Sequence, residues 1–394
     1  MSSGVRELLA ARRILVCVGC GGVGKTTIAA ALALEAARAG RRALVLTIDP
    51  ARRLADALGI RDLDDRVRTL PGDLQRELGI PAGGSLSAVM LDMKRTFDEL
   101  VERLASDPDS RERILHNRIY QHVSDALAGS VEYSAMEKVY QLAQQPDFDL
   151  IVVDTPPAQH ALDFLEAPQR LLEFLDSRVV QLLIHPAFAA SRVGVRLFQR
   201  STRRVLRLIE QLTGVGFLTD ISEFLLLFEG MADGFRRRAR HVRELLSGPE
   251  AAFLLVAGAD RESVAQSEQF LDRLEGFGVD LAGVVANRVR VWPEAVLPAE
   301  IRATPADLAR LGEALAAGAE PGFPSDAAAR AAIASAAGYA ALVRRDECAL
   351  ARLRGRLDGT RRFWCAVPEL DRDVHDLEAL SHVGRIVCGG VAAS

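Results

Sequence analysis

The most informative stretch of the sequence is Gly19-Cys20-Gly21-Gly22-Val23-Gly24-Lys25-Thr26-Thr27. It satisfies the phosphate-loop (P-loop) pattern G-x-x-x-x-G-K-[ST] in full. The preceding residues 14–18 are apolar and predict a buried strand, and the alanine-rich residues 28–37 predict a helix. Strand, glycine-rich loop and helix are the context that this pattern requires, so residues 19–27 are predicted to bind the phosphates of a nucleotide.

The residue types in this loop suit phosphate chemistry. Glycines let backbone N–H groups turn inward, and the helix N-terminus adds a partial positive charge. Lys25 is predicted to reach the outer phosphates and take part in catalysis, and the Thr26 hydroxyl is predicted to bind Mg²⁺. Lysine occurs only at positions 25, 94 and 138, so nearly all of the 49 basic residues are arginine. A lysine is expected at position 25 because its compact ammonium group fits inside the phosphate loop, whereas the larger guanidinium of arginine does not. The predicted nucleotide-binding residues here are Gly21, Gly22, Val23, Gly24, Lys25, Thr26 and Thr27.

Composition indicates a soluble globular chain of one large domain or two smaller ones. The sequence has 394 residues, of which 49% are hydrophobic and 26% charged. The net charge of -4 gives no reason to expect a nucleic-acid partner. Residues 1–13 lack a signal-peptide core, and Pro186 interrupts the longest uncharged stretch, 179–191, which is too short to span a membrane. A cytoplasmic, non-spanning protein is predicted.

The five cysteines predict free thiols in a reducing compartment. Cys17 and Cys20 form a C-x-x-C pair, but Cys17 falls in the predicted strand and Cys20 in the phosphate loop. No second C-x-x-C completes a four-thiolate site, so zinc is not expected.

Apolar runs alternate with helical patterns along much of the chain. Strands are predicted at residues 14–19, 43–49, 87–91, 150–154, 252–258, 282–286 and 363–367. Runs without polar alternation indicate strands covered on both faces, so the fold class is α/β with a doubly wound, mostly parallel sheet. Residues 293–324 are rich in proline and predict a loop-rich connection with one helix at 306–317, followed by a long helix at 327–353.

Between residues 161 and 246 the sequence predicts helices and no strand. Helical apolar faces recur at 171–182 and 205–212. They fit either a helical layer packed on its own core or a groove that holds an apolar partner, because both have the same pattern. Arginine clusters at 200–207 and 236–240 indicate a solvated face or, as a minor option, a surface for an anionic membrane or nucleic acid. The predicted organisation is a P-loop core in two parts, 1–160 and 248–394, with a helical insert at 161–247.

Three aspartates stand where such a sheet would deliver them to the phosphates. Asp154 ends the strand 150–154, as a Walker B carboxylate does, and Asp49 ends the second strand. Both are predicted, with Thr26, to hold Mg²⁺. Asp56 follows Asp49 by seven residues, about two turns into a helix if Pro50 begins one, and is a candidate to act on the attacking water. An aspartate after a strand also serves as a helix cap, which stays open as an alternative.

Several segments together resemble one family. The phosphate loop, Asp49-Pro50-Ala51-x-x-Leu54-x-Asp56 and Asp154-Thr155-x-Pro157-x-x-His160 resemble motifs of the ArsA-type ATPases. These comprise arsenite-pump subunits and the ATPase that targets tail-anchored membrane proteins, within the deviant Walker A (SIMIBI-type) class. The segment Met90–Glu99 resembles a bacterial ArsA-like subgroup. The resemblance implies two switch loops, Asp56 as the base or orienter of the water, and an ATP-dependent homodimer. It also implies that Asn287 recognises adenine and that Pro368 packs beside the base.

The chain departs from the family pattern at several points, one of which is the second switch motif, where Pro156, Ala158 and Gln159 replace the usual residues. The family's signature lysine, which reaches the partner's nucleotide, is replaced by Cys20. Either an arginine substitutes in trans, or hydrolysis is slow, or the dimer works differently. The zinc cysteines of the targeting factors and any cysteine in the insert, which arsenite binding needs, are also missing.

The sequence therefore predicts a cytoplasmic ATPase that uses ATP and Mg²⁺. It is predicted to act as a nucleotide-driven homodimeric clamp with an apolar protein client or a membrane partner. Two alternatives remain: an ATPase subunit of an anion transporter of the arsenite type, and a low-turnover, nucleotide-dependent scaffold or switch.

Overall fold

A single eight-stranded sheet organises the residues that the structure describes. The computed structural model describes residues 3–49, 53–60, 62–105, 107–117, 120–121, 130–156, 166, 173, 215–294, 296–317, 319–320 and 323–389. The strand order is β3-β4-β2-β5-β1-β6-β7-β8. All neighbouring strands are parallel except β3 and β4. The predicted doubly wound α/β architecture is confirmed.

Seven of the strands lie within two residues of their predicted starts. The strands are β1 Ile14–Gly19, β2 Arg42–Thr47, β3 Arg68–Thr69, β4 Ser85–Met90, β5 Leu150–Asp154, β6 Ala251–Gly258, β7 Leu281–Val289 and β8 Phe363–Pro368. The central strands β1 and β5 are buried along their whole length, which explains their uninterrupted apolar sequences. Strand β3 was not predicted, because two exposed residues carry no periodic signal.

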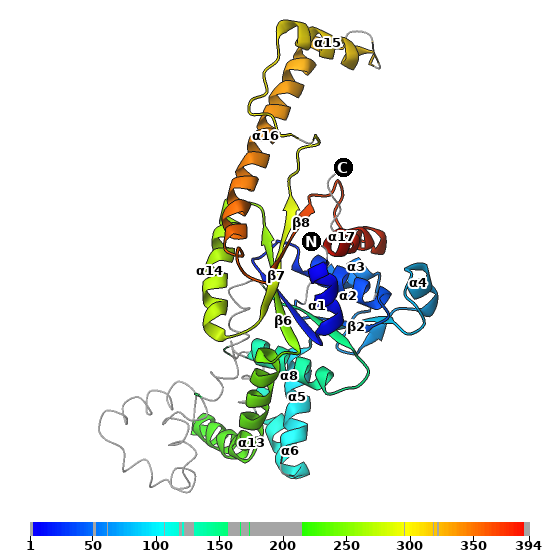
Figure 1. The fold of residues 1–394 in the computed structure, drawn as a ribbon. Coiled ribbons are helices and arrows are strands. Elements are labelled where there is room, and N and C mark those ends of the chain that lie inside the picture. Colours follow the sequence, from blue (N-terminus) through cyan, green and yellow to red (C-terminus); the bar gives the residue numbers. More distant parts are fainter. Residues whose placement is uncertain are drawn as a thin grey trace, which may run out of the picture.

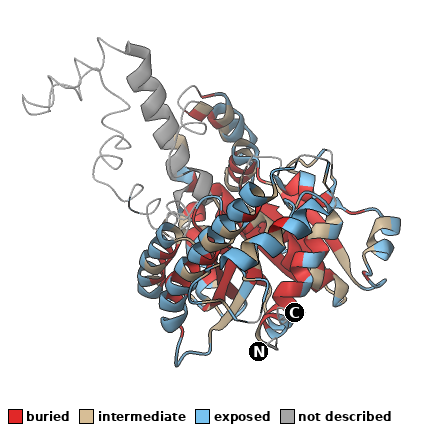
Figure 2. Ribbon diagram, turned by 90° about the horizontal axis from the view of Figure 1, so that it is seen from above, coloured by how far each residue is buried: buried red, intermediate tan, exposed pale blue. Residues whose placement is uncertain are grey.

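Helices cover both faces of the sheet. They are α1 Ser3–Ala11, α2 Lys25–Arg38, α3 Arg53–Leu58, α4 Gly72–Glu77, α5 Met93–Leu104, α6 Pro108–His116, α8 Ser130–Ala143, α13 Val215–Ser247, α14 Arg261–Phe277, α15 Pro305–Ala316, α16 Ser325–Gly355 and α17 Leu377–Gly389. Alternate residues of β1 enter different cores: Ile14 and Val16 pack with α5, α8 and α13, whereas Leu15 packs with α2 and α17. Figure 2 shows this as buried residues concentrated in the sheet and on the inner faces of the helices.

Two helical segments extend from the sheet. Helices α15 and α16 form an arm that projects beyond the carboxyl ends of β7 and β8 (Figure 1). Helix α13 lies at the opposite end of the molecule in Figure 1 and consists of the last 33 residues of the predicted insert. The helical faces predicted at 171–182 and 205–212 lie outside the described residues, apart from residue 173. Within the described part of the chain, no helix has the length and apolar character needed to cross a bilayer.

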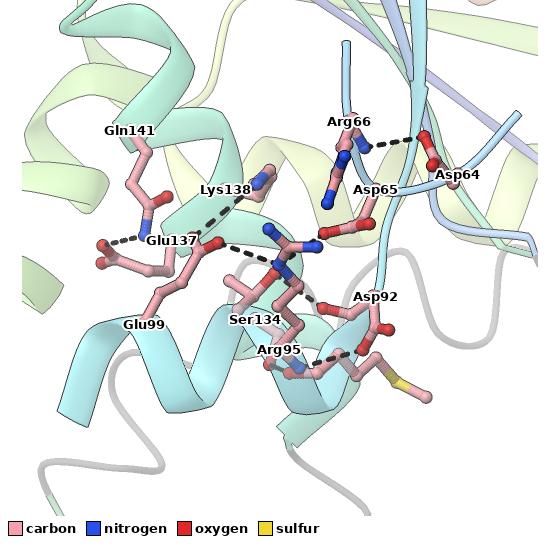
Figure 3. A network of polar contacts seen from close by, with 12 residues as sticks. Asp64, Asp65, Arg66, Asp92, Arg95, Glu99, Ser134, Glu137, Lys138 and Gln141 are labelled. Atoms are coloured by element: carbon pink, nitrogen blue, oxygen red, sulfur yellow. Dashed lines mark hydrogen bonds and ion pairs between the residues drawn. The ribbon is translucent and has the colours of Figure 1, made fainter. Parts of the chain in front are cut away.

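A polar network around α5 ties the segment Met90–Glu99 to its neighbours (Figure 3). Asp92 caps α5 by accepting a hydrogen bond from the Arg95 backbone N–H. The Arg95 side chain pairs with Asp65 at 2.8 Å and with Glu99 at 3.3 Å, and Glu99 lies 3.9 Å from Lys138 of α8. The network therefore joins the loop that follows α3 to α5 and α8.

Helix α13 is anchored to α8 by a largely buried ion pair. Glu137 of α8 is 1% exposed and accepts hydrogen bonds from the Arg238 guanidinium, one of them at 2.9 Å. Gln141 donates to the same carboxylate at 3.0 Å, and Arg238 lies over the Tyr140 ring at 5.1 Å. These contacts fix the end of α13 that returns to the core.

Candidate functional site

The phosphate loop connects β1 to α2 and passes close to two other strands. Gly24 precedes α2 in a left-handed conformation with φ of 89°. A β-carbon on Gly24 would lie 2.3 Å from Asn287 Nδ2, and one on Gly19 would lie 2.0 Å from the Val256 carbonyl oxygen. Only glycine fits at these two positions, because the loop is packed against β6 and β7. The helix N-terminus behind the loop supplies inward-facing N–H groups for an anion.

Asp154 lies at the carboxyl end of β5, behind the loop. Its Oδ2 accepts hydrogen bonds from Thr26 Oγ1 at 2.7 Å and from Thr47 Oγ1 at 3.0 Å. Its Oδ1 is buried and has no hydrogen-bond partner in the described structure. Burial raises the pKa of Asp154 to about 6, against the opposing effect of the two threonine hydrogen bonds.

The unpaired carboxylate oxygen of Asp154 indicates whether the site can bind a metal ion, because a metal ion would supply the partner that this oxygen lacks. Magnesium prefers oxygen ligands, and it is commonly held by one or two carboxylates together with waters and substrate phosphates. Asp154, the Thr26 hydroxyl and Asp49, which lies on the cavity wall, provide that kind of donor set. Among the described residues, no three His, Cys, Asp or Glu side chains form a cluster arranged to hold a metal ion. The oxygen donors present therefore fit a magnesium ion that is coordinated partly by these side chains and partly by the phosphates of a nucleotide.

Lys25 begins α2 and is nearly buried. Its Nζ donates a hydrogen bond to the Cys20 carbonyl oxygen at 2.8 Å, which holds the ammonium inside the curve of the loop. Burial lowers the pKa of Lys25, and the nearby Asp154 carboxylate opposes that shift. The site therefore holds a buried cation, Lys25, and a buried carboxylate, Asp154, close enough to influence each other's charge.

A cavity of about 570 Å³ opens over this loop. Its volume suits a ligand of nucleotide size. The cavity is lined by ten of the predicted site residues: Gly21, Gly22, Gly24, Lys25, Thr26, Thr27, Asp49, Asp56, Asn287 and Pro368. Val23 and Asp154 do not line it. Val23 is buried in the core, and Asp154 lies behind Thr26.

Asn287 and Asp56 reach the cavity from distant parts of the chain. The Asn287 side chain, from β7, donates to the Val23 carbonyl oxygen at 2.8 Å and so fastens β7 to the loop. Asp56 lies in the first turn of α3 as described from Arg53. Residues 50–52, where that helix was predicted to begin, and residues 157–160 of the second switch motif lie outside the described residues.

Several site residues were not predicted from the sequence. Thr47 holds the Asp154 carboxylate and also accepts a hydrogen bond from the Asp49 backbone N–H at 3.3 Å. Thr47 is the polar residue that ends the apolar run of β2, and that position was the signal in the sequence that could have identified it. The cavity also carries basic side chains that no motif assigned, namely Arg53, Arg288, Arg372 and His375.

Cys20 faces away from the cavity. Its side chain is 4% exposed, and its Sγ lies 3.9 Å from the Ser263 carbonyl oxygen of α14. Burial raises the pKa of the Cys20 thiol, so this position supplies no charge to the site.

This sheet, with a glycine-rich loop at the carboxyl end of its central strand and an aspartate at the end of the neighbouring strand β5, has the architecture of a P-loop nucleoside triphosphatase. Residues 12–300 match the model of the anion-transporting ATPase family, and the chain therefore belongs to that family. It is 25% identical over 282 residues to ATPase get3 of Schizosaccharomyces japonicus (71% of this chain, 75% of the relative). It is 24% identical over 298 residues to putative arsenical pump-driving ATPase 1 of Aquifex aeolicus (73% and 65%). An uncharacterized protein of Streptomyces coelicolor is 34% identical over 181 residues (46% and 42%).

Proposed function

We propose that the chain hydrolyses ATP in a Mg²⁺-dependent reaction at this cavity and uses the cycle as a dimeric clamp on an apolar protein segment. Membership of the anion-transporting ATPase family supports the ATPase activity. The metal and the residue roles are proposals that rest on the arrangement of the side chains, whereas the dimer and the client are proposals that rest on the resemblance of the sequence motifs to the ArsA-type ATPases.

The Asp154 carboxylate is the observation that carries the catalytic part. A buried carboxylate with one unpaired oxygen, bonded to the loop threonine at 2.7 Å, is unfavourable unless a ligand completes it. Asp154, Thr26 and Asp49 are the residues that would hold the metal ion. When bound, Mg²⁺ neutralises charge that develops on the phosphate oxygens during transfer.

The chain's own residues divide the remaining tasks. Lys25 and the N–H groups of the loop bind the outer phosphates, because their positive charge points into the curve of the loop. Asp56, on the cavity wall, orients the attacking water and accepts its proton. Asn287 and Pro368, which also line the cavity, contact the base.

The clamp requires that the site be linked to the insert. Helix α13 is rooted in α8 by Glu137 and Arg238, and α8 is joined through Glu99 to Arg95. Arg95 also pairs with Asp65, on the loop after the helix that carries Asp56. A movement of that loop on ATP binding is thereby passed to the insert, where the client binds.

The test is ATP turnover by the purified full chain, beside Lys25→Ala and Asp56→Asn. Turnover that depends on Mg²⁺ and is lost in both variants supports the reaction. The mass of the native protein, measured in ATP and in ADP, tests the dimer, and a dimer favoured by ATP supports it. Co-purification of the protein with apolar helical segments tests the client. Tight ATP binding without turnover in the parent protein contradicts the enzymatic proposal and favours the nucleotide-dependent scaffold.

A further inference from the structure

Arg288 has an unusual backbone for its residue type. Its φ is 56°, and it is the one non-glycine residue with positive φ in the part of the chain that the structure describes. This left-handed conformation is unfavourable for a residue with a β-carbon. The pairing of β7 with β8 shifts register between Ala286 and Val289, so Arg288 lies in an irregularity at the carboxyl end of β7. Such bulges re-aim a side chain, and they recur beside active sites.

The redirected side chain lies at the rim of the cavity, above the phosphate loop. Its Nη1 is 3.5 Å from the Gly22 carbonyl oxygen, and its Nη2 is 3.8 Å from the carboxylate of Asp373. Both contacts are long, and the Asp373 side chain is 93% exposed. Exposed pairs of this kind contribute little to stability, so these contacts do not offset the unfavourable backbone. The conformation is better explained by a ligand that the guanidinium binds.

The phosphate chain of a nucleotide is the ligand that best fits this position. A triphosphate needs several cations, and Lys25 supplies one from the inner side of the loop. Position 20 supplies none, because the Cys20 side chain is buried against α14. Arg288 reaches the same loop at the Gly22 carbonyl oxygen and lines the cavity, and its planar guanidinium matches phosphate oxygens.

We propose that Arg288 is a phosphate-binding residue for the nucleotide held by its own chain, and that it complements Lys25. This inference rests on the proposed function, since it requires ATP in the cavity. Stacking of the guanidinium on the adenine ring is the competing role. The nearest hydrogen-bond acceptor is a carbonyl of the phosphate loop, which favours the phosphates.

Equilibrium binding of adenosine, AMP, ADP and ATP separates these roles. Arg288→Ala is expected to weaken ADP and ATP binding about 10- to 100-fold, the effect of losing a hydrogen bond to a charged group, and to leave adenosine binding unchanged. Arg288→Lys should restore part of the loss because it keeps the charge. Arg302→Ala is the matched control, since that side chain is 81% exposed and is not among the residues that line the cavity.

Arg288→Asn tests whether the backbone conformation is retained for function. Asparagine tolerates the left-handed region, so this variant should melt at or above the temperature of the parent while binding ATP as weakly as Arg288→Ala. A purely structural role for Arg288 predicts the reverse, a lower melting temperature with normal ATP binding.

Other outcomes of these experiments would overturn either the role of Arg288 or the proposed function itself. Equal losses for adenosine and ATP indicate a contact with the base and overturn the proposal, as does unchanged ATP binding in Arg288→Ala. If Lys25→Ala abolishes ATP binding while Arg288→Ala does not, only the role of Arg288 fails. If the parent binds no ATP, the proposed function fails and the role of Arg288 fails with it.

Discussion

Asp154→Asn is expected to raise the stability of the nucleotide-free and metal-free protein, relative to the parent, progressively as pH increases towards neutral. The parent carboxylate is 1% exposed, and one of its oxygens has no hydrogen-bond partner among the described residues. The folded chain therefore holds a buried negative charge, which asparagine removes while keeping one oxygen to accept from Thr26 and Thr47. The same substitution is expected to abolish turnover if Asp154 holds the metal.

The magnitude follows from the pKa of Asp154, which burial raises from 3.8 to about 6. Because the folded chain keeps this proton to a higher pH than the unfolded chain, the free energy of unfolding of the parent falls as pH rises between about 4 and 6. At 1.36 kcal/mol per pKa unit, the whole loss is about 3 kcal/mol, of which about 2 kcal/mol falls between pH 4.5 and 8. The variant lacks this loss. Its stability relative to the parent should rise by about 2 kcal/mol over that range.

Urea unfolding in EDTA, at a series of pH values, measures this difference. The unpaired amide of the variant costs about 1–3 kcal/mol, but that cost does not depend on pH, so the slope is the test. Asp149→Asn is the control, because hydrogen bonding to Arg42 lowers the pKa of Asp149 to about 2. Its effect should be constant over the same range. A difference between Asp154→Asn and the parent that stays flat from pH 4.5 to 8 would refute the reasoning.

Two further substitutions test the packing around the site and the insert. Gly24→Ala should lower the free energy of unfolding by more than the roughly 1–2 kcal/mol of left-handed strain, because its β-carbon would lie 2.3 Å from Asn287 Nδ2. Gly59→Ala, at φ of 67° and with no atom within 4 Å of the new carbon, should show the strain alone; equal effects in the two variants would contradict the close approach. Glu137→Ala should destabilise the protein by about 3 kcal/mol in urea unfolding, because it leaves the partly buried Arg238 without its carboxylate. Glu137→Leu combined with Arg238→Leu should recover most of that loss, and a double variant as unstable as the single one would argue against this account.

The patterns in the sequence were sufficient to predict most of the sheet and the centre of the site. The phosphate loop and the strands around it are local features, carried by consecutive residues with a fixed spacing or an unbroken apolar run. Asp49 and Asp154 could be assigned to the loop because the carboxyl ends of neighbouring parallel strands meet at one edge of a sheet. The helix at 305–316 was predicted for the same local reason, and its start has a capping box at Thr304 and Asp307.

Other properties depend on contacts between residues far apart in the chain. The raised pKa of Asp154 results from complete burial beneath Thr26 and Thr47, which no motif encodes. The direction of the Cys20 side chain is set by the packing of α14 against the loop, 243 residues away. The left-handed backbone of Arg288 arises where β7 loses its register with β8. The sequence therefore predicts which residues form the phosphate loop. The tertiary structure decides their charge state and which other cations reach the cavity, because burial and side-chain direction depend on the whole set of neighbours.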